Sequence, residues 1–242
     1  SVALGASEVT PEELLSVYAT LAAGGVRRPL HLLRGVVDAT GAAVPGAALA
    51  EPVRVMGAEQ AYVLTRLLEG VVDRGTASSA RRLGFTAAVA GKTGTSNEAR
   101  DNWFVGYTAE RATLVWVGFD DGRATGLSGA RGALPVWVDY ERRLGDGDRA
   151  RPSAPPRGLE WVTIDPVSGG RITDACPDSL REVFVAGTAP RDACHLHGRG
   201  HRRRRPARLE DPLEPPRKRR WWRRIFGSGQ GAAFLPAFGS DR

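Results

Sequence analysis

Apolar residues recur at helical spacing in two stretches of the chain, residues 11–22 and 58–70. Thr10 precedes the first stretch and Glu13 lies three positions later, so the two form the pattern of a capping box with proline at the first helical position. Gly70 and Gly75 are stop signals for the second stretch, which we expect to end at Gly70. The spacing therefore predicts two amphipathic helices that pack on other elements.

A strand-like pattern follows the second predicted helix. Residues 90–95 and 102–107 predict the arms of a hairpin around a short polar turn, and residues 112–119 add a run rich in β-branched and aromatic side chains. We expect this third strand to be central or nearly central in its sheet, with Trp103 and Trp116 in the core. Together these elements predict an α+β fold, in which an antiparallel sheet is flanked by helices.

Changes in composition divide the rest of the chain. A helix that begins at Leu134 closes the first domain, and a segment rich in glycine, proline and charge follows it. Two short strands within residues 159–185 form a small β appendage, which must dock on the main domain or be stapled, because two such strands are not stable alone. The predicted parts are a domain at 1–144, a linker at 145–158, the appendage at 159–197 and a tail at 198–242.

The net charge of +7 is concentrated in the tail. Residues 198–242 hold 13 of the 34 Lys and Arg residues but only four of the 27 Asp and Glu residues. Low apolar content and proline interruptions predict that the tail is disordered. From Arg217 to Phe226, two tryptophans stand beside six positive charges, a pattern that suits an anionic membrane surface, although nucleic acid would satisfy the same charges. No run of about 18 apolar residues predicts a transmembrane helix.

The candidate chemistry lies in Lys92, Thr93, Gly94 and Thr95, in the first arm of the predicted hairpin. Lys92 offers a compact cation for a carboxylate, the threonines offer hydroxyl donors, and Gly94 removes a side chain that would block close approach. Strand alternation puts Lys92 and Gly94 on one face and the threonines on the other, so one ligand reaches both sets only at a sheet edge. The Thr95 N–H suits a developing oxyanion. The alternative is a hairpin in which Lys92 is merely solvated.

The sequence around this motif resembles one family. Gly-Lys-Thr-Gly-Thr-Ser-Asn at 91–97, Arg-Asp-Asn-Trp-Phe-Val-Gly-Tyr at 100–107 and Val-Trp-Val-Gly-Phe-Asp-Asp at 115–121 are similar to the third catalytic motif and following strands of class A penicillin-binding proteins. The similarity covers most of residues 1–197. It implies a penicillin-binding transpeptidase domain with a serine β-lactamase-like fold. It also implies a serine transpeptidase that cross-links peptidoglycan stem peptides, is trapped by β-lactams, and uses no cofactor.

Two motifs of that family are missing from this chain. Ser-x-x-Lys is absent, because Lys92 and Lys218 are the only lysines and neither follows a serine by three positions, and neither Asn97 nor Asn102 belongs to a Ser-x-Asn motif. Both motifs precede Lys-Thr-Gly in the family, so we interpret the chain as the C-terminal part of a transpeptidase domain. The anchor and glycosyltransferase domain of class A enzymes would lie upstream of Ser1. We predict that this polypeptide alone has no transpeptidase activity.

Carried over residue by residue, the resemblance assigns roles to the candidate motif. Lys92 would assist the serine of the second motif and the substrate carboxylate, Thr93 and Thr95 would bind that carboxylate, and the Thr95 N–H would complete an oxyanion hole while Gly94 keeps the cleft open. The resemblance also implies the extracytoplasmic face of the bacterial plasma membrane, where nucleic acid is not an expected partner. Two other interpretations stay open: a D,D-carboxypeptidase or β-lactamase relative, and a non-catalytic cell-envelope binding module.

Cys176 and Cys194 are the only cysteines, and an extracytoplasmic location favours a disulfide between them. Chain-entropy reasoning gives a closed loop of this length a stabilisation on the order of 3 kcal/mol. The alternative is a metal site built from the two cysteines with His195 and His197, which no Cys-x-x-Cys or His-x3-His spacing supports. We therefore predict the disulfide and no metal.

Overall fold

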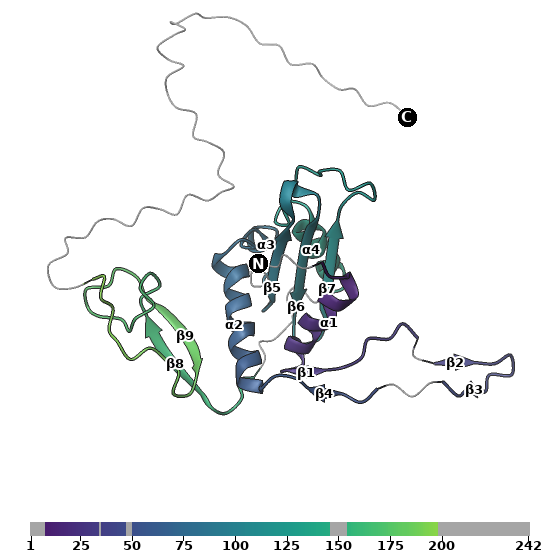
Figure 1. Ribbon diagram of the computed structural model, residues 1–242, viewed down its shortest axis with the longest axis horizontal. Coiled ribbons are helices and arrows are strands. Elements are labelled where there is room, and N and C mark those ends of the chain that lie inside the picture. The colour runs from purple at the N-terminus through teal and green to yellow at the C-terminus, as the bar shows by residue number, and fades with distance from the viewer. Residues whose placement is uncertain (1–7, 34, 47–49, 146–153, 198–242) are drawn as a thin grey trace, which may run out of the picture. The chain divides into compact units, whose positions relative to one another are not determined.

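The computed structural model describes residues 8–33, 35–46, 50–145 and 154–197 (Figure 1). Residues 1–199 belong to one compact unit. The predicted basic tail, with its run from Arg217 to Phe226, lies outside the described residues, as does most of the predicted linker. The four boundaries drawn from the sequence stay predictions. No described helix combines the length and the apolar character needed to cross a bilayer.

Helix α1 (Pro11–Ala22) begins with the capping box that its sequence predicts. The backbone N–H of Glu13 donates to Thr10 Oγ1 at 3.2 Å, and the Thr10 N–H donates back to the Glu13 carboxylate at 2.8 Å. The hydrogen bonds that the Thr10 N–H and hydroxyl donate to the Glu13 carboxylate lower the pKa of Glu13, because they favour its charged form. Two orphan N–H groups of the first turn are thereby satisfied, which fixes the start of the helix.

Helix α2 (Ala58–Arg74) runs one turn beyond the predicted stop at Gly70, so that predicted end was wrong. The helix continues because Val72, beyond the glycine, is fully buried in the core, and burial outweighs the weak helix propensity of a single glycine. The Arg74 side chain lies directly over Gly70, where a β-carbon would meet its guanidinium group. Helix α2 ends at Arg74, directly before Gly75, the second stop signal of the sequence.

The predicted hairpin is formed by β5 (Ala90–Thr95) and β6 (Asn102–Tyr107), and β7 (Ala112–Val117) pairs with β6. All pairs are antiparallel, and the register sets Lys92 opposite Val105 and Gly94 opposite Trp103. The order is β5-β6-β7. Within the described part of the chain β7 is therefore an edge strand, which corrects the expectation of a central one. The fold class is mixed, with antiparallel strands flanked by helices, as predicted.

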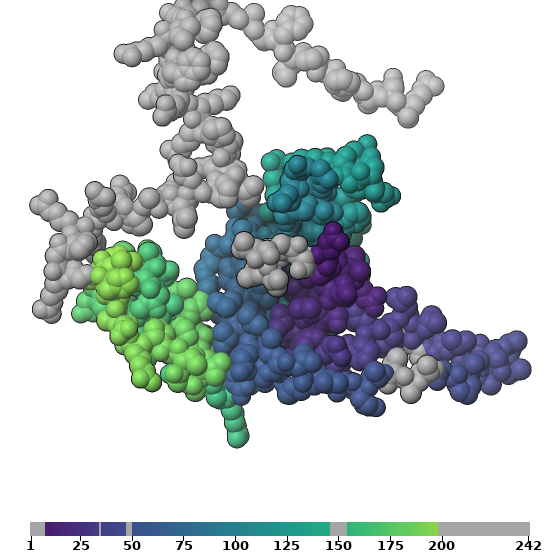
Figure 2. Space-filling view, in the orientation of Figure 1, coloured from purple at the N-terminus to yellow at the C-terminus, as the bar shows by residue number. Residues whose placement is uncertain are grey.

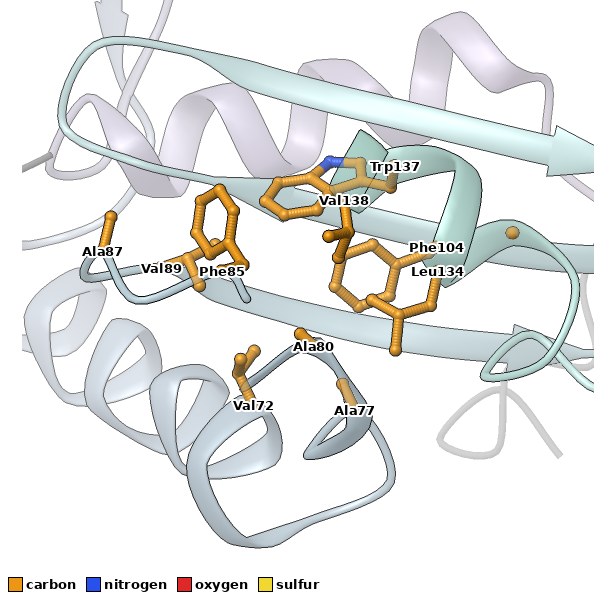
Figure 3. Close-up of a cluster of buried hydrophobic side chains, with 11 residues drawn as sticks. Val72, Ala77, Ala80, Phe85, Ala87, Val89, Phe104, Leu134, Trp137 and Val138 are labelled. Carbon is orange, nitrogen blue, oxygen red and sulfur yellow. The ribbon is translucent and has the colours of Figure 1, made fainter. Parts of the chain in front are cut away.

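One face of this sheet packs against α4 (Ala133–Arg143), the helix expected from Leu134. Trp137 contacts Phe85 and Phe104 edge-to-face, with ring centroids 5.0 and 5.1 Å away, and Figure 3 shows these rings at the centre of the core. All three side chains are at most 1% exposed. The core tryptophan is thus Trp137.

The two tryptophans that the sequence placed in the core lie elsewhere. Trp103 and Trp116 face each other across β6 and β7, with ring centroids 6.1 Å apart. Trp116 is 39% exposed, and its Nε1–H donates to Asp101 Oδ1 at 3.0 Å. The expectation failed for Trp116 because it lies near the end of β7, which has no further strand beside it within the described part of the chain.

Helices α1 and α2 cover the opposite face. Tyr107 and Phe104 lie an odd number of residues apart on β6, so their side chains point to opposite faces. Tyr107 shares a 2.8 Å hydrogen bond with Thr65 of α2 and meets the Tyr18 ring of α1 edge-on. Burial of Tyr107 raises its pKa to about 12, although the bond to Thr65 opposes the shift.

Two short strand pairs follow α1. Strands β1 (Val26–Arg27) and β4 (Val53–Arg54) pair at the base of an arm, and β2 (Val36–Val37) pairs with β3 (Ala43–Val44) farther out. Asp38 accepts hydrogen bonds from the N–H groups of Thr40 and Ala42 and so closes the outer turn. In the space-filling view the arm projects from the unit that holds the sheet (Figure 2).

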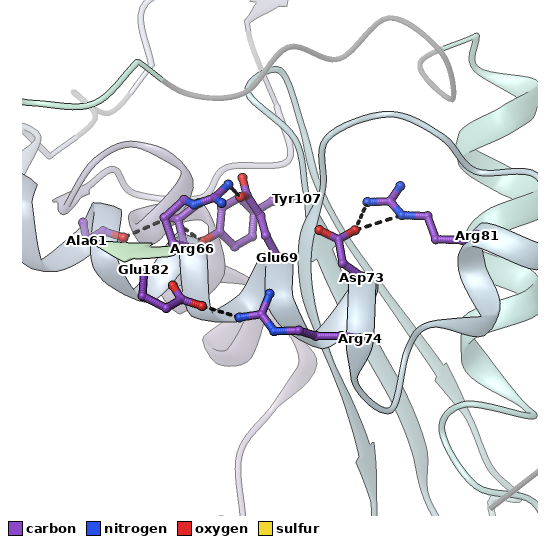
Figure 4. Close-up of polar contacts among 9 residues, drawn as sticks. Ala61, Arg66, Glu69, Asp73, Arg74, Arg81, Tyr107 and Glu182 are labelled. Carbon is purple, nitrogen blue, oxygen red and sulfur yellow. Dashed lines mark hydrogen bonds and ion pairs between the residues drawn. The ribbon is translucent and has the colours of Figure 1, made fainter. Parts of the chain in front are cut away.

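The appendage is an antiparallel pair, β8 (Leu159–Ile164) and β9 (Leu180–Val185), and it docks on α2 as expected. Arg74 of α2 forms an ion pair with Glu182 of β9, and the Arg66 guanidinium lies 5.7 Å from the centroid of the Trp161 ring. Figure 4 shows the first of these contacts beside a second ion pair that joins Asp73 to Arg81 of α3 (Ser79–Arg82). The outer surface of α2 therefore connects the appendage to the domain that contains the sheet.

Candidate functional site

The four candidate residues lie in β5, which pairs with β6 on one side and with no other described strand. Lys92 and Thr95 are exposed, and Thr93 and Gly94 are half-buried. The register confirms that Lys92 and Gly94 share one face while Thr93 and Thr95 share the other. The strand therefore presents side chains of both faces at the sheet edge, as the sequence led us to expect.

The backbone of β5 also presents groups at that outer edge. Beside the strand end, the Ser96 N–H donates to Asp101 O at 3.0 Å across the hairpin. Hydrogen-bonded and non-hydrogen-bonded pairs alternate in an antiparallel ladder, so the backbone groups of Thr95 and Thr93 point away from β6. Lys92 Nζ donates to the outward-pointing Thr93 carbonyl at 2.7 Å. A cation and the N–H of Thr95 thus occupy one edge.

Among the described residues, each threonine hydroxyl has one partner outside the strand. Thr93 Oγ1 lies 2.8 Å from Thr76 Oγ1, and Thr95 Oγ1 accepts a 2.9 Å hydrogen bond from the Gly129 N–H. Because the Thr95 hydroxyl accepts this bond, its own proton remains available to donate to an anion. Sequence reasoning assigned no role to Thr76 or Gly129, which lie 17 and 34 residues from their partners.

The loop at Gly129 packs directly on β5. A β-carbon at Gly129 would lie 2.4 Å from Gly94 O and 2.5 Å from Trp103 O, both rigid backbone atoms. Only glycine fits here without a backbone shift, so this residue sets how closely the loop approaches the candidate site. The run of small residues at 126–132 indicates a turn that could pack closely on a neighbour, but the sequence does not show that this neighbour is β5.

The turn that follows the site holds two non-glycine residues in the left-handed region, Glu98 at φ 60° and Ala99 at φ 53°. Thr125 fixes this turn, because its N–H and its hydroxyl both donate to Ala99 O, at 2.9 and 2.6 Å. The fully buried Asn102 amide donates in turn to Thr125 Oγ1 at 2.6 Å. This network holds a strained turn, a condition more common at functional sites than elsewhere.

A hollow of about 130 Å³ lies between α1 and α2, lined in part by Leu21, Tyr62, Thr65 and Pro156. No residue of β5 lines it. The candidate site is therefore an exposed strand edge rather than this hollow. Among the described residues, the edge carries a cation, hydroxyl groups and a backbone donor, which suit the binding of an anion or oxyanion but include no activated nucleophile.

The two cysteines of the appendage meet, but the structure holds both as free thiols rather than as the expected disulfide. Each sulfur faces other groups: the Thr173 N–H donates to Cys176 Sγ at 3.3 Å, and Cys194 Sγ lies 3.2 Å from His197 Nδ1. Asp165 completes the group, while His195 is exposed and lies outside it. The alternative metal site considered from the sequence therefore included Cys176, Cys194 and His197 correctly, but it contained His195 in place of Asp165.

Electrostatics in this cluster favour charged ligand groups. Burial raises the pKa of the Cys194 thiol, but contacts with Ser168, Cys176 and His197 outweigh it and lower that pKa to about 7. Burial likewise raises the pKa of Asp165, and hydrogen bonds from Ser168 bring it below its usual value. Thiolate and carboxylate forms therefore become accessible side by side.

Comparison with known proteins matches two segments of the chain to two family models. Residues 1–133 match the family described as penicillin binding protein transpeptidase domain, and residues 155–199 match the penicillin-binding protein 1A C-terminal domain. Penicillin-binding protein 1A of Neisseria gonorrhoeae is 36% identical over 165 residues, which cover 66% of this chain and 21% of that protein. That of Pseudomonas aeruginosa is 37% identical over 142 residues, covering 57% and 17%. The chain spans about a fifth of the length of these curated relatives.

Among solved structures, penicillin-binding protein 1A of Haemophilus influenzae superposes with a TM-score of 0.67 at 24% identity. The match covers 78% of this chain and 34% of that one. At this identity the likeness establishes the fold.

Proposed function

The chain belongs to the penicillin-binding protein transpeptidase family, and from that premise we propose that β5 forms one wall of a D,D-transpeptidase site that cross-links peptidoglycan. The observation that supports this most strongly is the exposed edge of β5. It brings together the Lys92 cation, the Thr93 and Thr95 hydroxyl groups and the outward N–H of Thr95. Such an edge also suits an extended stem peptide, which would add as a strand.

In this proposal the Thr93 and Thr95 hydroxyls bind the terminal carboxylate of a D-Ala-D-Ala stem peptide, and Lys92 supplies the balancing charge. The Thr95 N–H stabilises the oxyanion that develops when a serine attacks the penultimate D-Ala carbonyl. The terminal D-Ala then leaves with a proton. The amine of a stem peptide on a neighbouring peptidoglycan strand next attacks the acyl-serine ester, takes the acyl group and returns a proton to the serine. Gly94 leaves the approach to the strand open.

The attacking serine lies outside this chain, which has no Ser-x-x-Lys motif. We therefore propose that the chain alone is inactive and that it works as part of a bifunctional enzyme with a glycosyltransferase domain, on the extracytoplasmic face of the plasma membrane. β-Lactams would acylate the same serine. An anionic membrane surface, met through Arg217 to Phe226, is the proposed partner of the tail, and nucleic acid is not.

The test is acylation by a fluorescent penicillin. We expect no covalent label on the 242-residue chain. In the whole protein encoded by the gene we expect one labelled serine. Lys92→Ala should slow its acylation about 10- to 150-fold, because loss of a hydrogen bond to a charged carboxylate costs about 1.5–3 kcal/mol. Arg143→Ala, on the exposed side of α4, is the matched control and should leave the rate unchanged.

Labelling of the isolated chain would contradict the proposed external serine. If the whole protein also lacks Ser-x-x-Lys and Ser-x-Asn and takes no label, the proposal fails, and a non-catalytic cell-envelope module becomes the better account. Release of D-Ala without cross-linking would instead identify a D,D-carboxypeptidase relative.

A further inference from the structure

The loops of the β8–β9 appendage bring four potential metal ligands together. One ligand atom from each of Asp165, Cys176, Cys194 and His197 lies within 4.8 Å of every other. Asp165 directly follows β8, Cys176 lies in the loop between the strands, and the other two residues follow β9. Bridges from Arg171 to Ile164 and to Ala193 hold these segments side by side.

We propose that these four side chains bind one zinc ion in a tetrahedral structural site. Two thiolates, an imidazole and a carboxylate are a donor set that zinc prefers, and the thiolates disfavour magnesium and calcium. Zinc bonds of about 2.0–2.3 Å at tetrahedral angles would separate neighbouring ligand atoms by roughly 3.3–3.8 Å. The observed spacing is close to this, since His197 Nδ1 lies 3.2 Å from both Cys194 Sγ and Asp165 Oδ2.

The buried carboxylate is the observation that points most directly to a cation. Asp165 is 1% exposed, and its Oδ2 accepts no hydrogen bond within the described part of the chain, although it faces His197. A single Nδ1–H cannot serve both Oδ2 and Cys194 Sγ well, whereas a central cation satisfies every ligand atom at once.

The surroundings already orient these ligands. Asp165 Oδ1 accepts hydrogen bonds from the N–H groups of Val167 and Ser168, at 3.2 and 2.7 Å, which leaves Oδ2 for the metal. The Thr173 N–H donates to Cys176 Sγ. Hydrogen bonds of this kind to ligating carboxylates and thiolates are typical of protein metal sites.

The size of the appendage gives zinc a structural role. Domains below about 40 residues seldom bury enough apolar surface to be stable without a disulfide, a metal or a partner. The described residues of the appendage bury no aromatic side chain, and Trp161 is 39% exposed. A bound zinc would join the start, middle and end of the appendage and so replace the missing core.

The test uses the full chain, purified, fully reduced and freed of metal, and titrated with Co²⁺ as a spectroscopic probe. We expect one Co²⁺ per chain, with the intense visible bands of a tetrahedral site and a sulfur-to-cobalt charge-transfer band. One equivalent of Zn²⁺ should abolish both. Zinc should also slow the reaction of both thiols with a disulfide reagent.

Variants separate this site from adventitious binding. Changing even a group that only orients a ligand lowers metal affinity about 10- to 100-fold, so Asp165→Asn and His197→Gln should lower zinc affinity by about 100-fold or more. Asp165→Asn changes the side-chain shape little, which keeps the test valid if other variants fold poorly. His195→Gln is the matched control, because His195 is exposed and lies outside the cluster, and it should bind zinc unchanged.

Three outcomes would overturn the proposal. The first is a reduced chain that does not bind Co²⁺ or Zn²⁺ at one equivalent. The second is a loss of binding in His195→Gln as large as that in His197→Gln. The third is a chain that carries a Cys176–Cys194 disulfide when isolated without reductant and still takes no metal once it is reduced. The last result would restore the disulfide expected from the sequence.

Discussion

The sheet region and the appendage are both antiparallel, yet different forces hold them. Around β5, β6 and β7, the rings of Phe85, Phe104 and Trp137 form a core from which water is excluded. In the β8–β9 appendage the buried groups are small or polar, and they include the Asp165 and Glu182 carboxylates. Apolar burial is the main source of stability in the first region, whereas the second depends on contacts with α2 and on its cluster of ligand groups.

This difference also separates two kinds of site. The candidate catalytic residues are consecutive in one strand, so the strand geometry alone sets their relative positions. The proposed zinc ligands come from three loops and meet only when the appendage is folded. A strand edge can therefore accept ligands without local rearrangement. The cluster forms only when the appendage folds, and zinc bound there would in turn stabilise the folded appendage.

Replacing one tryptophan in each region should show the largest contrast. Trp137→Ala removes a ring that is 1% exposed and should lower the free energy of unfolding by about 3–5 kcal/mol. Trp161→Ala, in the appendage, removes a ring that is 39% exposed and stacked under two guanidinium groups, and should cost about 1 kcal/mol. Denaturant unfolding followed by circular dichroism measures both. Equal losses would mean that the two regions do not differ as described.

Alkaline pH should weaken the sheet region through Tyr107. Its folded-state pKa of about 12 lies above the ordinary value of 10.0, so its contribution is complete below pH 10 and is lost as pH rises toward 12. Two pKa units correspond to about 2–3 kcal/mol of unfolding free energy. Unfolding measured from pH 9 to 12 should show this fall, and Tyr107→Phe should remove most of it. The remainder comes from Tyr18 and Tyr62, because burial raises the pKa of both. Tyr140→Phe, on the exposed side of α4, should retain the full fall; an equal fall in Tyr107→Phe would show that Tyr107 is not its main source.

The smallest expected effect is at the junction between the regions. A double-mutant cycle of Arg74→Ala and Glu182→Ala should give a coupling energy of about 0.5–1 kcal/mol, because Arg74 is 47% exposed and water screens the pair. The Asp139–Arg143 pair on α4 is the control, with an expected coupling of about 0.3–0.5 kcal/mol. A coupling of zero at Arg74 and Glu182 would mean that the appendage does not depend on this contact.

Much of the sheet region could be predicted, because its signals are local. The capping box at Thr10 and Glu13 needs only four residues, and the alternation from Lys92 to Thr95 fixes the face of each side chain once the strand is recognised. The family motif around these residues added the chemistry. Hence the helix start, the hairpin and the edge position of the candidate site agree with the structure.

The parts that sequence reasoning missed depend on contacts between distant residues. Helix α2 passes Gly70 because Val72 packs in the core, and Gly129 reaches β5 from a loop 34 residues away. Asp165 joins the cysteines because the bridges at Arg171 hold their segments side by side, while His195, next to Cys194 in the sequence, is exposed and lies outside the cluster. Neither local propensity nor motif spacing carries that information.

Helix α2 belongs to both regions at once, and this affects how the protein unfolds. Its Thr65 and Val72 pack toward the sheet, and its Arg66 and Arg74 contact the appendage. An isolated helix of about this length is only marginally stable in water, so loss of either neighbour removes much of what keeps α2 helical. The two regions should therefore melt as one cooperative unit, with a single calorimetric transition whose van't Hoff and measured enthalpies agree.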